Sequence, residues 1–238
     1  MITKKPKMIL FDYGQTLMDE HGCDLLAGFD ALLQQAVSNK YNYTAEDIMA
    51  KWKETFDALG QFDPHYNLEI PNYIFLSYLF ESMSIQLPCK GADLDRIFWC
   101  TATPAVPTEG IREFLAFLRE NNIRTGVISN IMTCGEVLEQ RLQQILPEHS
   151  FEFVIATSDY MFKKPNARIF QLALAKADLQ PEDVWYIGNS YRCDVGGARS
   201  AGIFPVWYIG ATPDPQGNDD VLTISRWNEL KERLEKIS

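Results

Sequence analysis

The pattern of apolar and polar residues divides the chain into three parts. The first is a short apolar run, Met8–Phe11, which stops at Asp12 and is typical of a buried strand in a parallel sheet. In the second, from about residue 22 to residue 101, apolar residues recur every three or four positions, which predicts roughly four helices and no strand. Thr44, followed by Asp47 three residues later, is expected to begin one of these helices.

In the third part, after Pro107, helical and extended patterns alternate. Helical periodicity covers residues 108–121, 135–146, 166–177 and 193–201, and each is followed by an apolar run typical of a strand, at 125–128, 151–155, 184–187 and 204–208. Helices and strands that alternate in this way predict parallel β-α units. The expected fold class is therefore α/β: a Rossmann-like core with a parallel sheet, residues 1–18 and 102–238, interrupted by an all-helical domain, residues 19–101.

The charge balance and the cysteines narrow the classes of partner and compartment. The chain of 238 residues carries 22 Lys and Arg against 32 Asp and Glu, a net charge of −10, so neither nucleic acid nor an anionic membrane is expected as a partner. No apolar run reaches the roughly 18 residues of a membrane span, and the first run is too short for a signal peptide. Five cysteines, none in a Cys-x-x-Cys pair, indicate free thiols, and we expect a cytoplasmic protein.

Polar side chains follow the predicted strands at the points where those strands end. They are Asp12, the pair Ser129-Asn130, Lys164, and Asn189 with Asp194. In doubly wound parallel sheets, the carboxyl ends of the strands form the binding site. We therefore expect a site at which a carboxylate, a hydroxyl, an ammonium group and a second acidic residue converge.

These residues lie in four segments that resemble, in order, the four motifs of the haloacid dehalogenase (HAD) superfamily of hydrolases. The segments are Phe11-Asp12-Tyr13-Gly14-Gln15-Thr16-Leu17, Val127-Ile128-Ser129-Asn130, Lys164-Pro165-Asn166-Ala167-Arg168-Ile169-Phe170, and Ile187-Gly188-Asn189-Ser190-Tyr191-Arg192-Cys193-Asp194 followed by Gly197-Ala198 and Ala201-Gly202. The resemblance covers nearly the whole chain, because the helical insertion between the first two motifs is similar to the small helical cap of the family.

The resemblance implies a phosphatase that acts on a small-molecule phosphate ester through an aspartyl-phosphate intermediate. In this scheme Asp12 is the nucleophile, a role that divides a difficult hydrolysis into two steps. Lys164 and the hydroxyl of Ser129 complete the catalytic set by stabilising charge on the phosphoryl oxygens. Ser129, Asn130, Lys164 and Thr16 are the residues expected to bind the phosphate.

The resemblance also implies Mg²⁺, held by Asp12, the backbone carbonyl of Gly14, Asn189 and Asp194, but two of these positions depart from the family pattern. The family has a second aspartate at position 14, which protonates the leaving group and activates water, and Gly14 cannot supply that proton. General acid–base catalysis contributes about 10²–10⁴-fold, so ordinary esters are expected to turn over poorly unless another group substitutes. Asn189 replaces a metal-binding aspartate, which predicts weaker Mg²⁺ binding.

Three polar residues, Asp19, Glu20 and His21, stand where the helical insertion begins. We favour the interpretation that they cap its first helix. The other interpretation is that Glu20 or His21 supplies the acid that Gly14 lacks. Asp194 also has two interpretations, since it either orients Lys164 or holds a metal-bound water.

Two further functions are left open by the sequence. A chain that has lost both aspartates could bind phosphate esters without turning them over. The chain also resembles 2-haloacid dehalogenases, which lack the second aspartate of the first motif and need no metal. Those enzymes use an arginine of the cap, whereas the first arginine of this chain, Arg96, lies at the far end of the insertion. The sequence indicates neither the identity of the substrate nor the oligomeric state.

Overall fold

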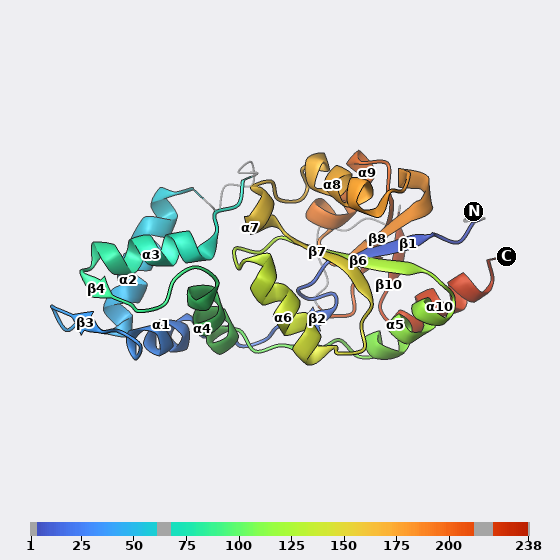
Figure 1. Cartoon of the computed structure of the whole chain (residues 1–238). Coiled ribbons are helices and arrows are strands. Elements are labelled where there is room, and N and C mark those ends of the chain that lie inside the picture. Colours follow the sequence, from blue (N-terminus) through green and yellow to red (C-terminus); the bar gives the residue numbers. More distant parts are fainter. Residues whose placement is uncertain (1–3, 61–67, 212–220, 238) are drawn as a thin grey trace.

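The central feature of the fold is a six-stranded sheet, shown in Figure 1 in a computed structural model that describes residues 4–60, 68–211 and 221–237. Its strand order is β10-β9-β8-β1-β6-β7, and every pair of neighbouring strands is parallel. The strands are β1 (Met8–Phe11), β6 (Arg124–Ser129), β7 (Phe151–Ala156), β8 (Val184–Gly188), β9 (Phe204–Tyr208) and β10 (Leu222–Ile224). The predicted α/β fold with a parallel sheet is confirmed.

Helices cover both faces of the sheet (Figure 1). One face carries α5 (Ile111–Glu120), α6 (Gly135–Ile145) and α10 (Trp227–Glu235), and the other carries α8 (Ala167–Ala177) and α9 (Gly197–Ser200). Side chains alternate along β1, so Ile9 and Phe11 join one apolar core and Met8 and Leu10 join the other. All four side chains are fully buried, as expected for a central strand covered on both faces.

A second group of helices, separate from those on the sheet, lies within the segment that we refer to as the helical insertion (residues 19–101). These helices are α1 (Leu25–Leu33), α2 (Ala45–Ala58), α3 (Asn72–Ser82) and α4 (Ala92–Ala102), and they share an apolar core of their own. The predicted start of α2 is confirmed. The backbone N–H of Thr44 donates to Oδ2 of Asp47 at 2.8 Å, and the N–H of Asp47 donates to Oγ1 of Thr44 at 3.4 Å, which together form a capping box.

The expectation that the insertion contains no strand is wrong in one detail. β3 (Ser38–Asn39) pairs with β4 (Ile85–Gln86) in an antiparallel arrangement. Each strand has two residues, which is too few for an alternating apolar pattern to be visible in the sequence.

The sheet core also contains elements that the apolar pattern did not predict correctly. β10, at the edge of the sheet, has only three residues, and α10 follows it. The helix expected at residues 193–201 is a π-helical turn, Tyr191–Gly196, that continues into α9. A short helix, α7 (Thr157–Tyr160), follows β7, and a 3-10 turn, Pro181–Asp183, precedes β8.

The chain crosses between the insertion and the sheet core at a short antiparallel pair, β2 (Met18–Asp19) with β5 (Val106–Pro107). Within the sheet, β1 lies between β6 and β8, and the chain passes from β7 to β8 on the opposite side of β1. The carboxyl ends of β1, β6 and β8 therefore border the crevice in which doubly wound sheets hold their ligands. Within the described part of the chain, no helix is long and apolar enough to cross a membrane.

Candidate active site

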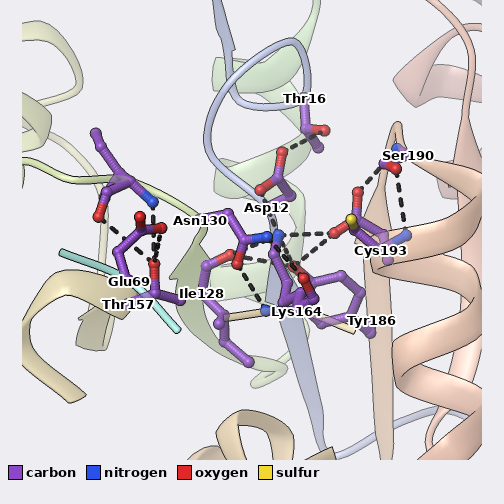
Figure 2. Close-up of polar contacts among 12 residues, drawn as sticks. Asp12, Thr16, Glu69, Ile128, Asn130, Thr157, Lys164, Tyr186, Ser190 and Cys193 are labelled. Carbon is purple, nitrogen blue, oxygen red and sulfur yellow. Dashed lines mark hydrogen bonds and ion pairs between the residues drawn. The ribbon is translucent and has the colours of Figure 1, made fainter. Parts of the chain in front are cut away.

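The ammonium group of Lys164 lies buried between two carboxylates at this crevice (Figure 2). Its Nζ atom is 2.6 Å from Oδ1 of Asp12 and 2.7 Å from Oδ1 of Asp194. Asp12 follows β1, Lys164 follows α7, and Asp194 belongs to the π-helical turn after β8. The fold thus brings together three of the residues that the sequence singled out.

The second carboxylate oxygen of Asp12 is also engaged. Oγ1 of Thr16 donates to Oδ2 of Asp12 at 3.2 Å (Figure 2), and the backbone N–H of Asp12 donates to the carbonyl of Ile187 at 2.8 Å. Thr16 is fully buried. The structure therefore places the Thr16 hydroxyl on the expected nucleophile, where it orients the carboxylate.

Burial is the largest influence on the protonation of this pair. It raises the pKa of Asp12 to about 6, although the charge of Lys164 acts in the opposite direction. Burial alone would lower the pKa of Lys164, but the carboxylates of Asp12 and Asp194 outweigh it and raise that pKa above its ordinary value. At neutral pH the site therefore holds a carboxylate on Asp12 beside an ammonium group on Lys164.

Tyr186, in β8, is a site residue that sequence analysis did not identify. Its phenolic oxygen accepts a hydrogen bond from Nζ of Lys164 at 2.8 Å and donates one to the carbonyl of Ile128 at 3.1 Å. Lys164 also donates directly to that carbonyl at 3.1 Å. Burial raises the pKa of Tyr186 well above its usual value, so the phenol stays neutral. The only signal in the sequence is a tyrosine in a buried strand, whose hydroxyl needs a partner.

The Ser129-Asn130 pair at the end of β6 divides into two roles. Ser129 is buried and lines the same pocket as Asp12 and Lys164. The amide of Asn130 instead holds the backbone of Lys164: its Oδ1 accepts from the N–H at 2.7 Å, and its Nδ2 donates to the carbonyl at 2.9 Å (Figure 2). The pair does not cap the next helix, because the N-cap of α6 is Cys134.

Oxygen donors suited to a hard cation lie near Asp12. Gly14 and Asn189 line the pocket with it, although the carbonyl of Asn189 already accepts from Nε1 of Trp207 at 2.8 Å. Asp194 is less available as a ligand, because its Oδ1 binds Lys164 and its Oδ2 accepts from the N–H of Ser190 at 2.8 Å. Among the described residues, no cluster of three or more His, Cys, Asp or Glu side chains could hold a metal.

The donors near Asp12 therefore consist of one carboxylate and neutral oxygens. Such a set suits Mg²⁺, which keeps several of its waters and is also bound by substrate phosphates.

A pocket of about 470 Å³ opens over Asp12, and the helical insertion contributes Glu20, Cys23 and Trp99 to its lining. Glu20 lines the pocket and does not cap a helix. The expectation that Asp19, Glu20 and His21 cap α1 is wrong: the cap is Asp24, whose carboxylate accepts from the N–H of Ala27 at 3.0 Å.

Arg96 does not provide the cation that a 2-haloacid dehalogenase would need. It forms ion pairs with Asp93 and, at 3.4 Å, with Glu136 of α6, and it does not line the pocket. Among the described residues that line the pocket, Lys164 is the only cation. Lys164 is already shared between two buried carboxylates, and Arg141, which lies over the ring of Trp99 at 4.0 Å, does not line the pocket.

Comparisons with known proteins agree with these motifs. The sequence profile of haloacid dehalogenase-like hydrolases matches residues 101–208. A glyceraldehyde 3-phosphate phosphatase from Methanothermobacter thermautotrophicus is 25% identical over 235 residues, which cover 96% of this chain and 99% of that protein.

Two solved structures share the fold over nearly their whole length. A HAD phosphatase from Thermococcus onnurineus has a TM-score of 0.67 and 20% identity, covering 97% of this chain and 98% of its own. A 2-haloacid dehalogenase from Pseudomonas syringae has a TM-score of 0.65 and 19% identity, covering 97% of this chain and 99% of its own. The fold alone therefore does not separate the two activities.

The profile and the full-length relative point to the same family of hydrolases. The matched residues 101–208 contain Ser129, Lys164 and Asp194, and the relative extends the likeness over nearly the whole chain. These findings confirm the resemblance of the motifs to the haloacid dehalogenase superfamily of hydrolases.

Proposed function

We propose that the protein is a phosphatase that removes the phosphoryl group of a small phosphorylated molecule through an aspartyl-phosphate on Asp12. The observation that carries this proposal is the buried contact of 2.6 Å between the Asp12 carboxylate and the Lys164 ammonium group at the strand ends. Phosphoryl transfer requires a positioned nucleophile beside fixed positive charge. The named relative that matches over its full length is also a phosphatase.

In the first step, an oxygen of Asp12 attacks phosphorus and the bond from phosphorus to the ester oxygen breaks. Lys164 stabilises the negative charge of the phosphoryl group, while Asp194 and Tyr186 keep its ammonium group in place. The hydroxyl of Ser129 donates a hydrogen bond to a phosphoryl oxygen. In the second step, water attacks the same phosphorus atom and Asp12 is released with inorganic phosphate as the product.

The donor set next to Asp12 fits Mg²⁺, and we include that ion in the proposal. Asp12, the carbonyl of Gly14 and the side chain of Asn189 would hold it, while Asp194 serves mainly to fix Lys164. When bound, the ion would supply positive charge that offsets the charge of the phosphoryl oxygens. Because Asp12 is the only carboxylate among these three ligands, we expect weak affinity for Mg²⁺.

We further propose that the helical insertion is a cap that selects the substrate. It is attached to the sheet core by Asp95, which accepts from the N–H of Cys134 at 2.8 Å, and by Glu69, which accepts from the hydroxyl of Thr157 at 3.1 Å. Trp99 of this insertion lines the pocket. A volume of about 470 Å³ suits a small metabolite.

A substrate screen tests the proposal. The purified protein would be incubated with a panel of phosphate esters, with and without Mg²⁺, and with 2-chloropropionate as the dehalogenase substrate. We expect release of inorganic phosphate that requires Mg²⁺, and no chloride. Tight binding of esters without phosphate release would instead support the non-catalytic alternative, and chloride release would support a dehalogenase.

A further inference from the structure

The structure places a carboxylate where Gly14 leaves the family's proton-transfer group missing. A Cβ atom added at Gly14 would lie 3.1 Å from Oε2 of Glu20. A side chain at position 14 would therefore grow toward the volume that the Glu20 carboxylate fills. Both residues line the pocket that contains Asp12.

We propose that Glu20 is the acid–base residue of this active site and does from the helical insertion what an aspartate at position 14 would do from the sheet core. This inference rests on the proposed phosphatase function. It assigns a catalytic role to a residue outside the four motifs that define the family.

The backbone that carries Glu20 is held in place next to the nucleophile. Nε2 of Gln15 donates to the carbonyl of Glu20 at 2.8 Å. The N–H of Gln15 donates to the carbonyl of Met18 at 2.6 Å, and the strand before Glu20 pairs with Val106–Pro107. A fixed backbone at this point keeps the side chain within reach of the pocket, as a proton donor in the reaction requires.

The surroundings of Glu20 suit a group that both gives and accepts a proton. Its Oε1 atom is buried without a hydrogen bond of good geometry in the described residues, and the same holds for the hydroxyl of Tyr13 and for Nη1 of Arg141. Burial raises the pKa of Glu20 to about 6, Arg141 and Tyr13 act to lower it, and Asp12 acts to raise it further.

His21, the other residue considered for this role, is placed differently. Its Nε2 lies 2.6 Å from Oδ1 of Asp19, and its side chain is 70% exposed. It does not line the pocket. The geometry therefore favours Glu20 over His21.

Glu20 gives up one proton in the first step and takes one back in the second. When Asp12 forms its bond to phosphorus, the carboxylic acid of Glu20 gives its proton to the departing ester oxygen, which leaves as an alcohol, and Glu20 becomes a carboxylate. When water attacks the aspartyl-phosphate, the Glu20 carboxylate takes a proton from that water as the bond from phosphorus to Asp12 breaks. Glu20 is then protonated again, and inorganic phosphate leaves.

The test compares Glu20→Gln with the wild-type protein in Mg²⁺, using 4-nitrophenyl phosphate and glycerol phosphate. Nitrophenolate needs no proton to leave, so the variant should release one equivalent in a burst at the wild-type rate. Later turnover should be about 10²-fold slower, because hydrolysis of the aspartyl-phosphate lacks its base. With glycerol phosphate the burst itself should be lost. Glu120→Gln, which removes an exposed carboxylate at the end of α5, is the matched control and should behave as wild type.

A second variant keeps the proposal testable if Glu20→Gln is unstable. Glu20→Ala opens the space beside position 14, and adding Gly14→Asp to it should restore glycerol phosphate turnover. Wild-type turnover of both esters by Glu20→Gln, a burst slowed equally on both esters, or no restoration by Gly14→Asp would overturn the role of Glu20 alone. Absence of phosphate release from either ester by the wild-type protein would overturn the proposed phosphatase function, and the role of Glu20 with it.

Discussion

The side-chain amide of Asn130 forms two hydrogen bonds with the backbone of Lys164, accepting from its N–H at 2.7 Å and donating to its carbonyl at 2.9 Å. Through this pair, the end of β6 fixes the position of the loop that carries the central cation. Asn130 was expected to contact phosphate, and its side chain instead positions Lys164, the residue that we propose stabilises the phosphoryl group.

Replacing Asn130 should therefore lower the rate without unfolding the protein. We expect Asn130→Ala to reduce kcat by about 10- to 100-fold, because a small displacement of Lys164 misaligns it with the phosphoryl group. Steady-state kinetics with Mg²⁺ and 4-nitrophenyl phosphate would measure this. Asn121→Ala is a suitable control, because the amide of Asn121 donates to the carbonyl of Phe117 at the end of α5, away from Lys164. Equal kcat values for both variants would show that the Asn130 contact has no positioning role.

Lys164 should be important for stability as well as for activity. Lys164→Met leaves the carboxylates of Asp12 and Asp194 buried without their shared partner, which we expect to cost about 3–5 kcal/mol in the free energy of unfolding. Urea unfolding at neutral pH would measure the loss, and no phosphatase activity should remain. The neighbouring Lys163→Met should cost much less, since that side chain is only half-buried. Comparable stabilities would argue against a tightly coupled buried cluster.

The attachment of the helical insertion through Asp95 should depend on pH. Its carboxylate accepts from the N–H of Cys134 and from Nδ2 of Asn72, so Asp95→Ala leaves both donors unpaired, at a cost of about 1–3 kcal/mol. Burial raises the pKa of Asp95 to about 6, although both hydrogen bonds act to lower it. The native state therefore binds the proton more tightly than the unfolded state between pH 3.8 and about 6.

The sign of this effect follows from the raised pKa. The stabilisation from the bound proton is complete below pH 3.8 and is lost as the pH rises through about 6, by at most about 3 kcal/mol. Urea unfolding at pH 4 and pH 7 should show a larger advantage of wild type over Asp95→Ala at pH 4. Asp93→Ala, on the exposed side of α4, is the control. An advantage that is the same at both pH values would contradict this account of Asp95.

Asn189 should limit the affinity for Mg²⁺. Asn189→Asp adds a carboxylate to a donor set in which Asp12 is the main charge, and we expect the half-saturating Mg²⁺ concentration to fall severalfold. Isothermal titration calorimetry and the Mg²⁺ dependence of turnover would both report it. Asn228→Asp, on the surface of α10, controls for the change in net charge. An unchanged or weaker affinity in Asn189→Asp would remove Asn189 from the proposed ligands.

Much of the fold could be predicted because strong patterns determine it. The buried strand before Asp12 and the alternating segments after Pro107 are long enough to be recognised. β10 and the pair β3 and β4 are too short for such recognition, and they are held by neighbouring strands rather than by their own sequence.

The candidate site was predictable where a motif covers it and not elsewhere. Asp12 and Lys164 meet as expected, because Asp12 directly follows β1 and Lys164 lies in the loop after β7 and α7. Tyr186 was missed because nothing in the strand pattern distinguishes its hydroxyl from other buried side chains. Glu20 could be suspected from its position, but only the structure shows its carboxylate beside the space at Gly14. Such contacts depend on the tertiary arrangement of the insertion against the core.

The central claim is that Asp12 carries a phosphoryl group during turnover. The most direct test is mass spectrometry of protein quenched in acid during the reaction with 4-nitrophenyl phosphate and Mg²⁺. We predict one added phosphoryl group on the peptide that contains Asp12 in the wild-type protein, more of it in Glu20→Gln, and none in Asp12→Asn. Turnover without a phosphorylated Asp12 peptide, or equal phosphorylation of Asp12→Asn, would contradict the account.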